Sequence, residues 1–155
     1  MSNKTQKVLI IEDDKEISDM LLDFLPRNGF IADAAPDGLI GLRKVASGDY
    51  SLILLDLMLP FKSGDEFLRE MRQFSDVPVI VLSAKSLTKD KIDLLHLGAD
   101  DYVTKPFDLN ELLARILSNI KRYGGNCTAE NKIITNGQMS FIELLTGGCT
   151  VLLLC

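Results

Sequence analysis

The sequence predicts an α/β fold, a (βα)5 doubly wound parallel sheet in which five strands alternate with five helices. One rhythm repeats from residue 7 to about residue 123: a short apolar run, a turn, then an amphipathic stretch. The apolar runs are nearly continuous and rich in β-branched residues, which is typical of strands covered on both faces. At 155 residues the chain is long enough for one domain with a substantial core.

The predicted strands are the five short apolar runs. Each is followed by a turn and then by a helical pattern, as expected where helices connect parallel strands. The runs are Val8–Ile11, Phe30–Ala35, Leu52–Leu55, Val79–Leu82 and Tyr102–Val103.

Helices are predicted where apolar residues recur at intervals of three and four. The last of them spans Leu109 to Ile120, with Asp108 as its expected N-cap. The first carries its apolar residues at Ile17, Met20, Leu21, Phe24 and Leu25. The other helices are expected at Asp37–Ala46, Ser63–Phe74 and Lys89–Leu97, with glycines that stop helices at Gly29, Gly48 and Gly98.

Composition excludes several classes of protein. No apolar run approaches the roughly 20 residues of a membrane helix, and the first apolar run meets acids too soon for a secretory signal. The net charge of −5 gives the whole chain no basic footprint for nucleic acid. All three cysteines, Cys127, Cys149 and Cys155, fall near the end. We expect free thiols and a cytoplasmic location.

Chemically useful side chains follow four of the predicted strands. In open parallel sheets, ligands bind beyond the carboxyl ends of the strands, where the strand order reverses. With the order 2-1-3-4-5, which flavodoxin and CheY share, the first and third strands flank that point. Glu12, Asp13 and Asp56 then share one pocket, and Ser83 and Lys105 approach from the neighbouring strands.

This combination predicts phosphoryl transfer onto a carboxylate. Three clustered carboxylates repel one another and favour a hard cation, for which Mg²⁺ is the best candidate. Lys105 adds a positive charge and Ser83 a hydroxyl donor. Because a carboxylate directly after a buried run needs a partner, we interpret Asp56 as the nucleophile.

Each residue also has a simpler interpretation when it is taken alone. Asp56 could be a turn residue, and Ser83 could cap the next helix. Lys105 could be an ordinary loop lysine, and Glu12-Asp13-Asp14 could be the solvated start of the first helix, with Asp14 only as its cap. The functional interpretation is favoured because complementary groups end four different strands at one edge.

Four motifs resemble the receiver domain of bacterial two-component response regulators. They are VLIIEDD, LILLDLMLP followed by Gly64, VIVLSAK, and LGADDYVTKPFDLNELLARI, the last being characteristic of the OmpR/PhoB type. The resemblance covers residues 7–123, and we expect residues 1–123 to form the receiver domain. It implies a phosphorelay switch rather than an enzyme, in which Asp56 accepts phosphate from a sensor histidine kinase and the domain assists its own phosphorylation and slow dephosphorylation.

The resemblance also implies a role for each residue of the site. Asp13 and Asp56 would bind Mg²⁺ directly, together with the backbone carbonyl of Met58, and Glu12 would act through water. Lys105 would contact the phosphoryl group.

Two further residues would report phosphorylation. Ser83 would move toward the phosphoryl group, and Tyr102 would turn inward behind it, as in a two-state switch. The simpler interpretation of Tyr102 is a half-buried aromatic residue of a strand.

In this type of regulator the fourth helix, fifth strand and fifth helix form a symmetric homodimer face. The candidate residues here are Lys91, Asp100, Asp101, Glu111 and Arg115. The alternative is that they are solvated surface charges.

The chain departs from the family at Phe61, where relatives usually have glycine, and we expect this residue to alter the loop or a partner contact. Met58 and Lys85 flank the phosphorylation site and are expected to tune the lifetime of the phosphate.

Residues 124–155 are expected to be a linker, beginning at Gly124-Gly125, and an incomplete or frame-shifted remnant of a winged-helix effector. They contain no recognition helix, and Lys132 is the only cation after Arg122. Direct DNA binding by this chain is therefore not expected.

Three rival functions remain open. One is a transcription regulator that acts through this chain, and another is a flavodoxin-like cofactor protein, although three acids would repel an FMN phosphate. The last is a stand-alone receiver that acts as a protein-interaction module without DNA binding.

Overall fold

The structure is a computed structural model that describes residues 4–84, 92, 93 and 95–125. Lys85, Lys91, the three cysteines and the predicted effector remnant after residue 125 lie outside the described residues. The chain divides into two units, Met1–Ile116 and Leu117–Cys155, and the sheet belongs entirely to the first. Among the described residues, no helix has the length and apolarity that crossing a membrane requires.

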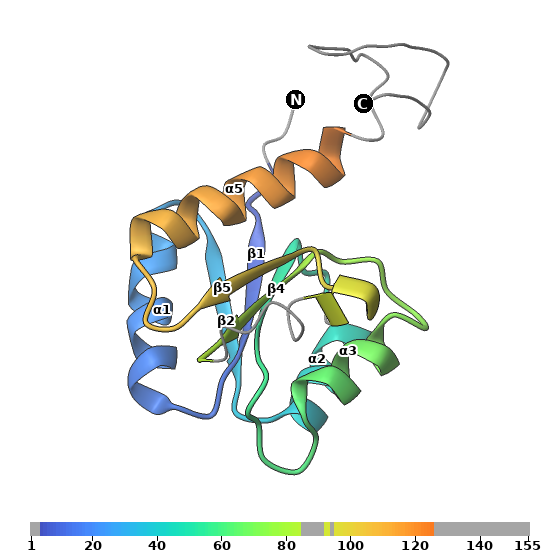
Figure 1. The fold of residues 1–155 in the computed structure, drawn as a ribbon. Coiled ribbons are helices and arrows are strands. Elements are labelled where there is room, and N and C mark those ends of the chain that lie inside the picture. Colours follow the sequence, from blue (N-terminus) through green and yellow to red (C-terminus); the bar gives the residue numbers. More distant parts are fainter. Residues whose placement is uncertain (1–3, 85–91, 94, 126–155) are drawn as a thin grey trace, which may run out of the picture. The chain divides into compact units, whose positions relative to one another are not determined.

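Five parallel strands form one sheet in the order β2-β1-β3-β4-β5 (Figure 1). This confirms the predicted strand order. Within the sheet Ile11 is in register with both Ala35 and Leu55, so β1 and β2 end at the same level and β3 runs one residue further, to Asp56. The strands are β1 (Lys7–Ile11), β2 (Ile31–Ala35), β3 (Leu52–Asp56), β4 (Val79–Ser83) and β5 (Asp101–Thr104).

Helices connect the strands and lie on both sides of the sheet, with α1 on one side and α2 and α3 on the other (Figure 1). Of the predicted fourth helix, Lys89–Leu97, the described residues 92, 93, 95 and 96 are helical. The complete helices are α1 (Lys15–Arg27), α2 (Gly38–Ser47), α3 (Gly64–Met71) and α5 (Leu109–Gly125). The glycine pair that we expected to begin a linker is the end of α5.

Carboxylate and hydroxyl caps start these helices. Asp14 accepts hydrogen bonds from the backbone N–H groups of Glu16 and Ile17, so its predicted role as a cap is confirmed. Asp108 accepts in the same way at the start of α5, from Asn110 at 2.7 Å. Ser63 forms a capping box at the start of α3.

Helix α3 is shorter than the sequence predicted. We expected it to reach Phe74, but it ends at Met71. The hydrogen bonding changes there to the tighter pattern of a 3₁₀ turn: the N–H of Phe74 donates to the carbonyl of Met71, three residues back, at 3.1 Å. Phe74 is 53% exposed, so no apolar contact favours another helical turn.

The core lies where the two layers of helices meet the sheet. Strands β1, β3 and β4 are almost fully buried, as their apolar runs predicted. Edge strand β2 is covered less, and Ile31 is 48% exposed. In α1 the buried face follows Ser18, Leu21 and Leu25, whereas Met20, one of the apolar residues that predicted this helix, is 39% exposed.

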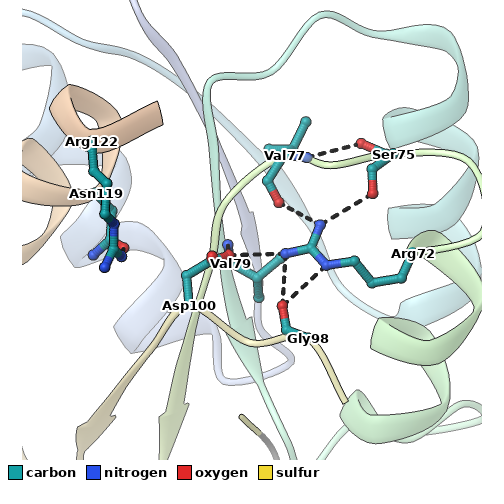
Figure 2. Close-up of polar contacts among 8 residues, drawn as sticks. All are labelled: Arg72, Ser75, Val77, Val79, Gly98, Asp100, Asn119 and Arg122. Carbon is teal, nitrogen blue, oxygen red and sulfur yellow. Dashed lines mark hydrogen bonds and ion pairs between the residues drawn. The ribbon is translucent and has the colours of Figure 1, made fainter. Parts of the chain in front are cut away.

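At the edge where β4 and β5 begin, which we call the amino edge, Arg72 joins two loops (Figure 2). Its Nη1 donates to the carbonyls of Ser75 and Val77, at 3.1 and 2.7 Å. Its Nε and Nη2 donate to the carbonyl of Gly98, at 3.0 and 2.8 Å. Nη2 also donates to Asp100 Oδ2 at 2.9 Å. All five donors of the guanidinium group therefore have an acceptor.

Asp100 completes this network, since the same Oδ2 accepts a hydrogen bond from the N–H of Val79 at 2.9 Å. The side chain of Asp100 is only 16% exposed. A residue that the sequence suggested for a dimer face is thus engaged within the chain.

Candidate functional site

The opposite edge, where the strands end, carries the acidic residues that the sequence singled out. Asp56 is the last residue of β3 and is 4% exposed, whereas Glu12 directly follows β1 and is 3% exposed. The N–H of Glu12 donates to the carbonyl of Ala35 at 3.1 Å, which continues the pairing of β1 with β2. Asp13 is exposed. Oxygens of the three carboxylates lie within 4.8 Å of one another, as the strand order predicted.

Lys105 reaches this acidic cluster from the end of β5. Its Nζ donates to Glu12 Oε1 at 2.8 Å and lies 3.5 Å from Asp56 Oδ1. Its backbone N–H donates to the carbonyl of Ser83 at 2.8 Å, which fixes the start of its loop to β4. The sequence placed Lys105 at the site but gave no signal for Glu12 as its nearest partner.

Burial sets the electrostatics of the cluster. Burial raises the pKa of Glu12, the hydrogen bond from Lys105 lowers it, and the neighbouring Asp56 raises it again, so that it reaches about 7. Burial lowers the pKa of Lys105, but Glu12 and Asp56 outweigh this effect and raise it. Lys105 therefore stays charged. Its single positive charge lies beside two buried carboxyl groups, Glu12 and Asp56, and cannot neutralise both. The cluster can accept a proton or a cation.

The loop between β3 and α3 is tightly constrained around Asp56. Asp56 Oδ1 accepts a hydrogen bond from the N–H of Met58 at 3.2 Å. The N–H of Gly64 donates to the carbonyl of Leu57 at 3.1 Å. A Cβ at Gly64 would lie 2.7 Å from the carbonyl oxygen of Asp56, so the glycine of the sequence motif is required for this close approach.

Ser83 and Tyr102 occupy the neighbouring strands. Ser83 ends β4, is fully buried, and is in register with Thr104. Tyr102 is 9% exposed and packs in the core cluster, so it is more buried than the half-exposed strand aromatic of the simpler interpretation. Their movement on phosphorylation stays a prediction.

The charged residues suggested for a dimer face are partly linked to one another. Arg115 on α5 donates to Asp101 Oδ1 at 2.8 Å and contacts Glu111 at 3.1 Å. The side chain of Arg115 is 39% exposed, so these pairs stand at the surface. The remaining candidate, Lys91, lies outside the described residues.

Phe61 is the site feature whose geometry the sequence did not reveal. It has a backbone φ of +68°, and its side chain is 86% exposed. Few residues with a Cβ adopt a positive φ. The comparison with the glycine usual in similar sequences was the only signal of this conformation.

Comparisons with known proteins agree with this geometry. Residues 8–117 match the family described as the response regulator receiver domain. The transcriptional regulatory protein DltR of Streptococcus agalactiae is 47% identical over 111 residues, which cover 71% of this chain and 50% of DltR. The chain thus spans about half the length of the curated relatives it matches.

Solved structures share the fold. The receiver domain of the Francisella response regulator 1452 has a TM-score of 0.74 and 38% identity, over 77% of this chain and 99% of that one. The receiver domain of the Pseudomonas aeruginosa sensor histidine kinase PA1611, with a magnesium ion coordinated in its active-site cleft, has a TM-score of 0.70 and 30% identity, over 76% and 98%. With its strand order, its acidic cluster and its lysine, the chain belongs to the response regulator receiver domain family.

Proposed function

We propose that this chain is a phosphorelay response regulator in which Asp56 accepts a phosphoryl group from a sensor histidine kinase in a Mg²⁺-dependent reaction. One observation carries the proposal: Asp56 is a buried carboxylate with a lysine ammonium group 3.5 Å away and two further carboxylates beside it. A buried carboxylate that is only partly balanced is suited to receive an incoming group together with its counter-charge.

The acidic cluster suits Mg²⁺. Its oxygens lie within 4.8 Å of one another, and magnesium prefers carboxylate and carbonyl oxygen ligands. We propose that Asp13 and Asp56 bind it directly with the backbone carbonyl of Met58, and that Glu12 acts through water. The magnesium ion in the PA1611 receiver domain supports this assignment. When bound, the ion neutralises charge on the phosphoryl oxygens.

The protein side chains supply the rest of the reaction. An Asp56 oxygen forms the new P–O bond while the P–N bond of the phosphohistidine breaks, and its electron pair stays on the imidazole nitrogen. In the free protein Lys105 donates a hydrogen bond to Glu12. During the reaction its ammonium group turns to a phosphoryl oxygen and stabilises the negative charge there. Slow hydrolysis of the acyl phosphate would return Asp56 to its free state.

Output follows from a change of conformation. We propose that Ser83 moves toward the phosphoryl group and Tyr102 fills the space behind it, which biases the surface of the fourth helix, β5 and α5. Homodimerisation through Asp101, Glu111 and Arg115 is part of this proposal, with Lys91 and Asp100 as the other candidates.

Control of transcription, in the cytoplasm, is proposed by analogy with DltR. Direct DNA binding is not assigned to this chain. Its alternative role is that of a stand-alone receiver that binds another protein.

The test is to incubate the protein with acetyl phosphate, with and without Mg²⁺, and to measure its intact mass. We expect the addition of one phosphate that depends on Mg²⁺, is absent in Asp56→Asn, and is strongly slowed in Lys105→Ala. Asp65→Asn, in the first turn of α3, is a matched control that should behave as wild type. No phosphate in the wild type, or equal labelling of Asp56→Asn, would refute the proposal.

A further inference from the structure

The loop between β3 and α3 contains a strained turn. The N–H of Lys62 donates to the carbonyl of Pro60 at 2.7 Å, and Phe61 between them has a φ of +68°. A hydrogen bond between residues i and i+2 around a positive φ marks the rarer, strained kind of γ-turn. Glycine would adopt this conformation without a steric penalty. The chain nevertheless has phenylalanine there.

The fold does not need the phenylalanine ring. Phe61 is 86% exposed, more than any other large apolar side chain in the part of the chain that the structure describes. Its neighbours hold the turn in place. Lys62 pairs with Glu70 on α3, and Ser63 forms the capping box of that helix. The loop is therefore anchored on one side of Phe61, while its ring projects into solvent and stabilises the core little.

The exposed ring belongs to the loop that carries the phosphoacceptor. Met58 lies between Asp56 and Phe61, is 66% exposed, and donates its N–H to Asp56 Oδ1. The same loop approaches α2, since a Cβ at Gly38 would lie 3.0 Å from the carbonyl oxygen of Lys62. A protein that delivers a phosphoryl group to Asp56 must approach across this edge of the sheet, whereas a small phosphodonor need not touch the loop.

We propose that Phe61 is a specificity-determining residue for protein phosphodonors. This inference rests on the proposed function. In it, the exposed side chains of Met58 and Phe61 contact an apolar patch beside the phosphohistidine of the donor protein. Aromatic side chains and methionine are enriched in interfaces, where a few buried anchors carry most of the binding energy. Transfer from small phosphodonors does not depend on the ring.

The covalent step is the same with either donor. An Asp56 carboxylate oxygen forms the P–O bond while the donor's bond to phosphorus breaks. From phosphohistidine the electron pair stays on the imidazole nitrogen, from phosphoramidate it leaves with ammonia after protonation by water, and from acetyl phosphate it leaves with acetate. Only the surface that surrounds the phosphoryl group differs between these donors.

The experiment compares kcat/KM for phosphorylation of the full chain by two probes. One probe is an autophosphorylated sensor histidine kinase, chosen from a purified panel because it phosphorylates the wild type. The other is phosphoramidate, which has a P–N bond but no protein surface. Phe61→Ala keeps the backbone constraint and removes the ring, whereas Phe61→Gly removes both, and Phe61→Leu retains apolar bulk. Phe74→Ala is the matched control, an exposed phenylalanine beyond the opposite end of α3.

For Phe61→Ala and Phe61→Gly, we expect a roughly tenfold lower kcat/KM with the kinase and less than about a twofold change with phosphoramidate. Phe61→Leu should restore part of the loss, and Phe74→Ala should match the wild type with both probes.

Three results would overturn the inference: an equal loss with both probes, no loss with the kinase, or a loss in Phe61→Gly alone, which would implicate the backbone turn. A wild type that phosphoramidate labels but no kinase in the panel phosphorylates would also overturn it. Failure of phosphoramidate to label the wild type would instead refute the proposed function.

Discussion

The two edges of the sheet bury charge in different ways. At the amino edge, the guanidinium of Arg72 has an acceptor for all five donors, and its carboxylate partner Asp100 also accepts a backbone N–H (Figure 2). At the carboxyl edge, the single ammonium group of Lys105 faces two buried carboxylates, Glu12 and Asp56. The side chains of Arg72 and Lys105 are both 18% exposed. The difference between the edges is thus in the completeness of the polar network and not in its burial.

This difference separates an edge that fixes the structure from the edge to which we assign the proposed chemistry. A complete network of buried hydrogen bonds fixes the loops that it joins and leaves nothing for a ligand to satisfy. An incomplete one holds unfavourable charge that a cation or a phosphoryl group can relieve. The Arg72–Asp100 ion pair therefore holds two loops together. The Lys105–Glu12 ion pair, in contrast, leaves carboxylate charge that a bound cation can neutralise.

The largest expected effect comes from breaking the complete network. Arg72→Ala removes five hydrogen bonds and leaves the Asp100 carboxylate without its ion pair, which should lower the free energy of unfolding by about 3 kcal/mol or more. Arg72→Lys keeps the positive charge but lacks the planar guanidinium group, so its free energy of unfolding should lie between those of the wild type and Arg72→Ala. Urea unfolding measures both. Arg69→Ala, which changes an exposed arginine in the last turn of α3, should alter stability by less than about 0.5 kcal/mol. An equal effect of the two alanine variants would contradict this assignment.

The incomplete network should appear as a pH dependence of stability. The pKa of Glu12 is raised from 4.5 to about 7, so between these values the folded chain keeps a proton that the unfolded chain has released. The contribution of Glu12 to the free energy of unfolding therefore falls as pH rises from about 4.5 to 7, by at most about 3 kcal/mol.

Glu12→Gln removes this titration and should flatten the profile over that range. Urea unfolding at a series of pH values, without divalent cations, measures the two slopes. Parallel profiles for the variant and the wild type would show that Glu12 does not carry the effect.

A smaller effect is expected from relieving the strained turn at the carboxyl edge. Phe61→Gly should raise the free energy of unfolding by about 1 kcal/mol, because glycine adopts a positive φ without the Cβ penalty. Phe61→Ala keeps the strain and should show no such gain. The comparison of the two variants by thermal unfolding isolates the backbone contribution, and a gain of the same size in both would attribute it to loss of the exposed ring.

The smallest effect is expected at the surface pairs of Arg115. Arg115→Ala removes contacts with Asp101 and Glu111 at a side chain that is 39% exposed, so the stability of the monomer should fall by less than about 1 kcal/mol. If these residues form the proposed dimer face, the same variant should weaken association of the phosphorylated protein by a larger factor. Analytical ultracentrifugation with acetyl phosphate and Mg²⁺ separates the two effects. Unchanged association would remove Arg115 from the dimer face.

The sequence predicted the sheet and the acidic cluster because both depend on local patterns. Apolar runs defined the strands, and the rule that ligands gather at the carboxyl ends of parallel strands brought Glu12 and Asp56 together before any distance was known. The end of α3 was missed because helical periodicity does not show where apolar contacts with neighbouring elements stop. The Arg72 network was missed because it joins loops through backbone carbonyls, which every residue has.

Lys105 and Glu12 are separated by 93 positions in the chain, and their ion pair closes the site. β5 is an edge strand and the last of the described strands to leave the ribosome, so Asp56 emerges long before Lys105 does. A contact between such distant positions carries a loop-closure cost, which is typical of slowly formed pairings. A nascent chain would therefore present the carboxylate of Asp56, the proposed phosphoacceptor, without its counter-charge until β5 has paired with β4.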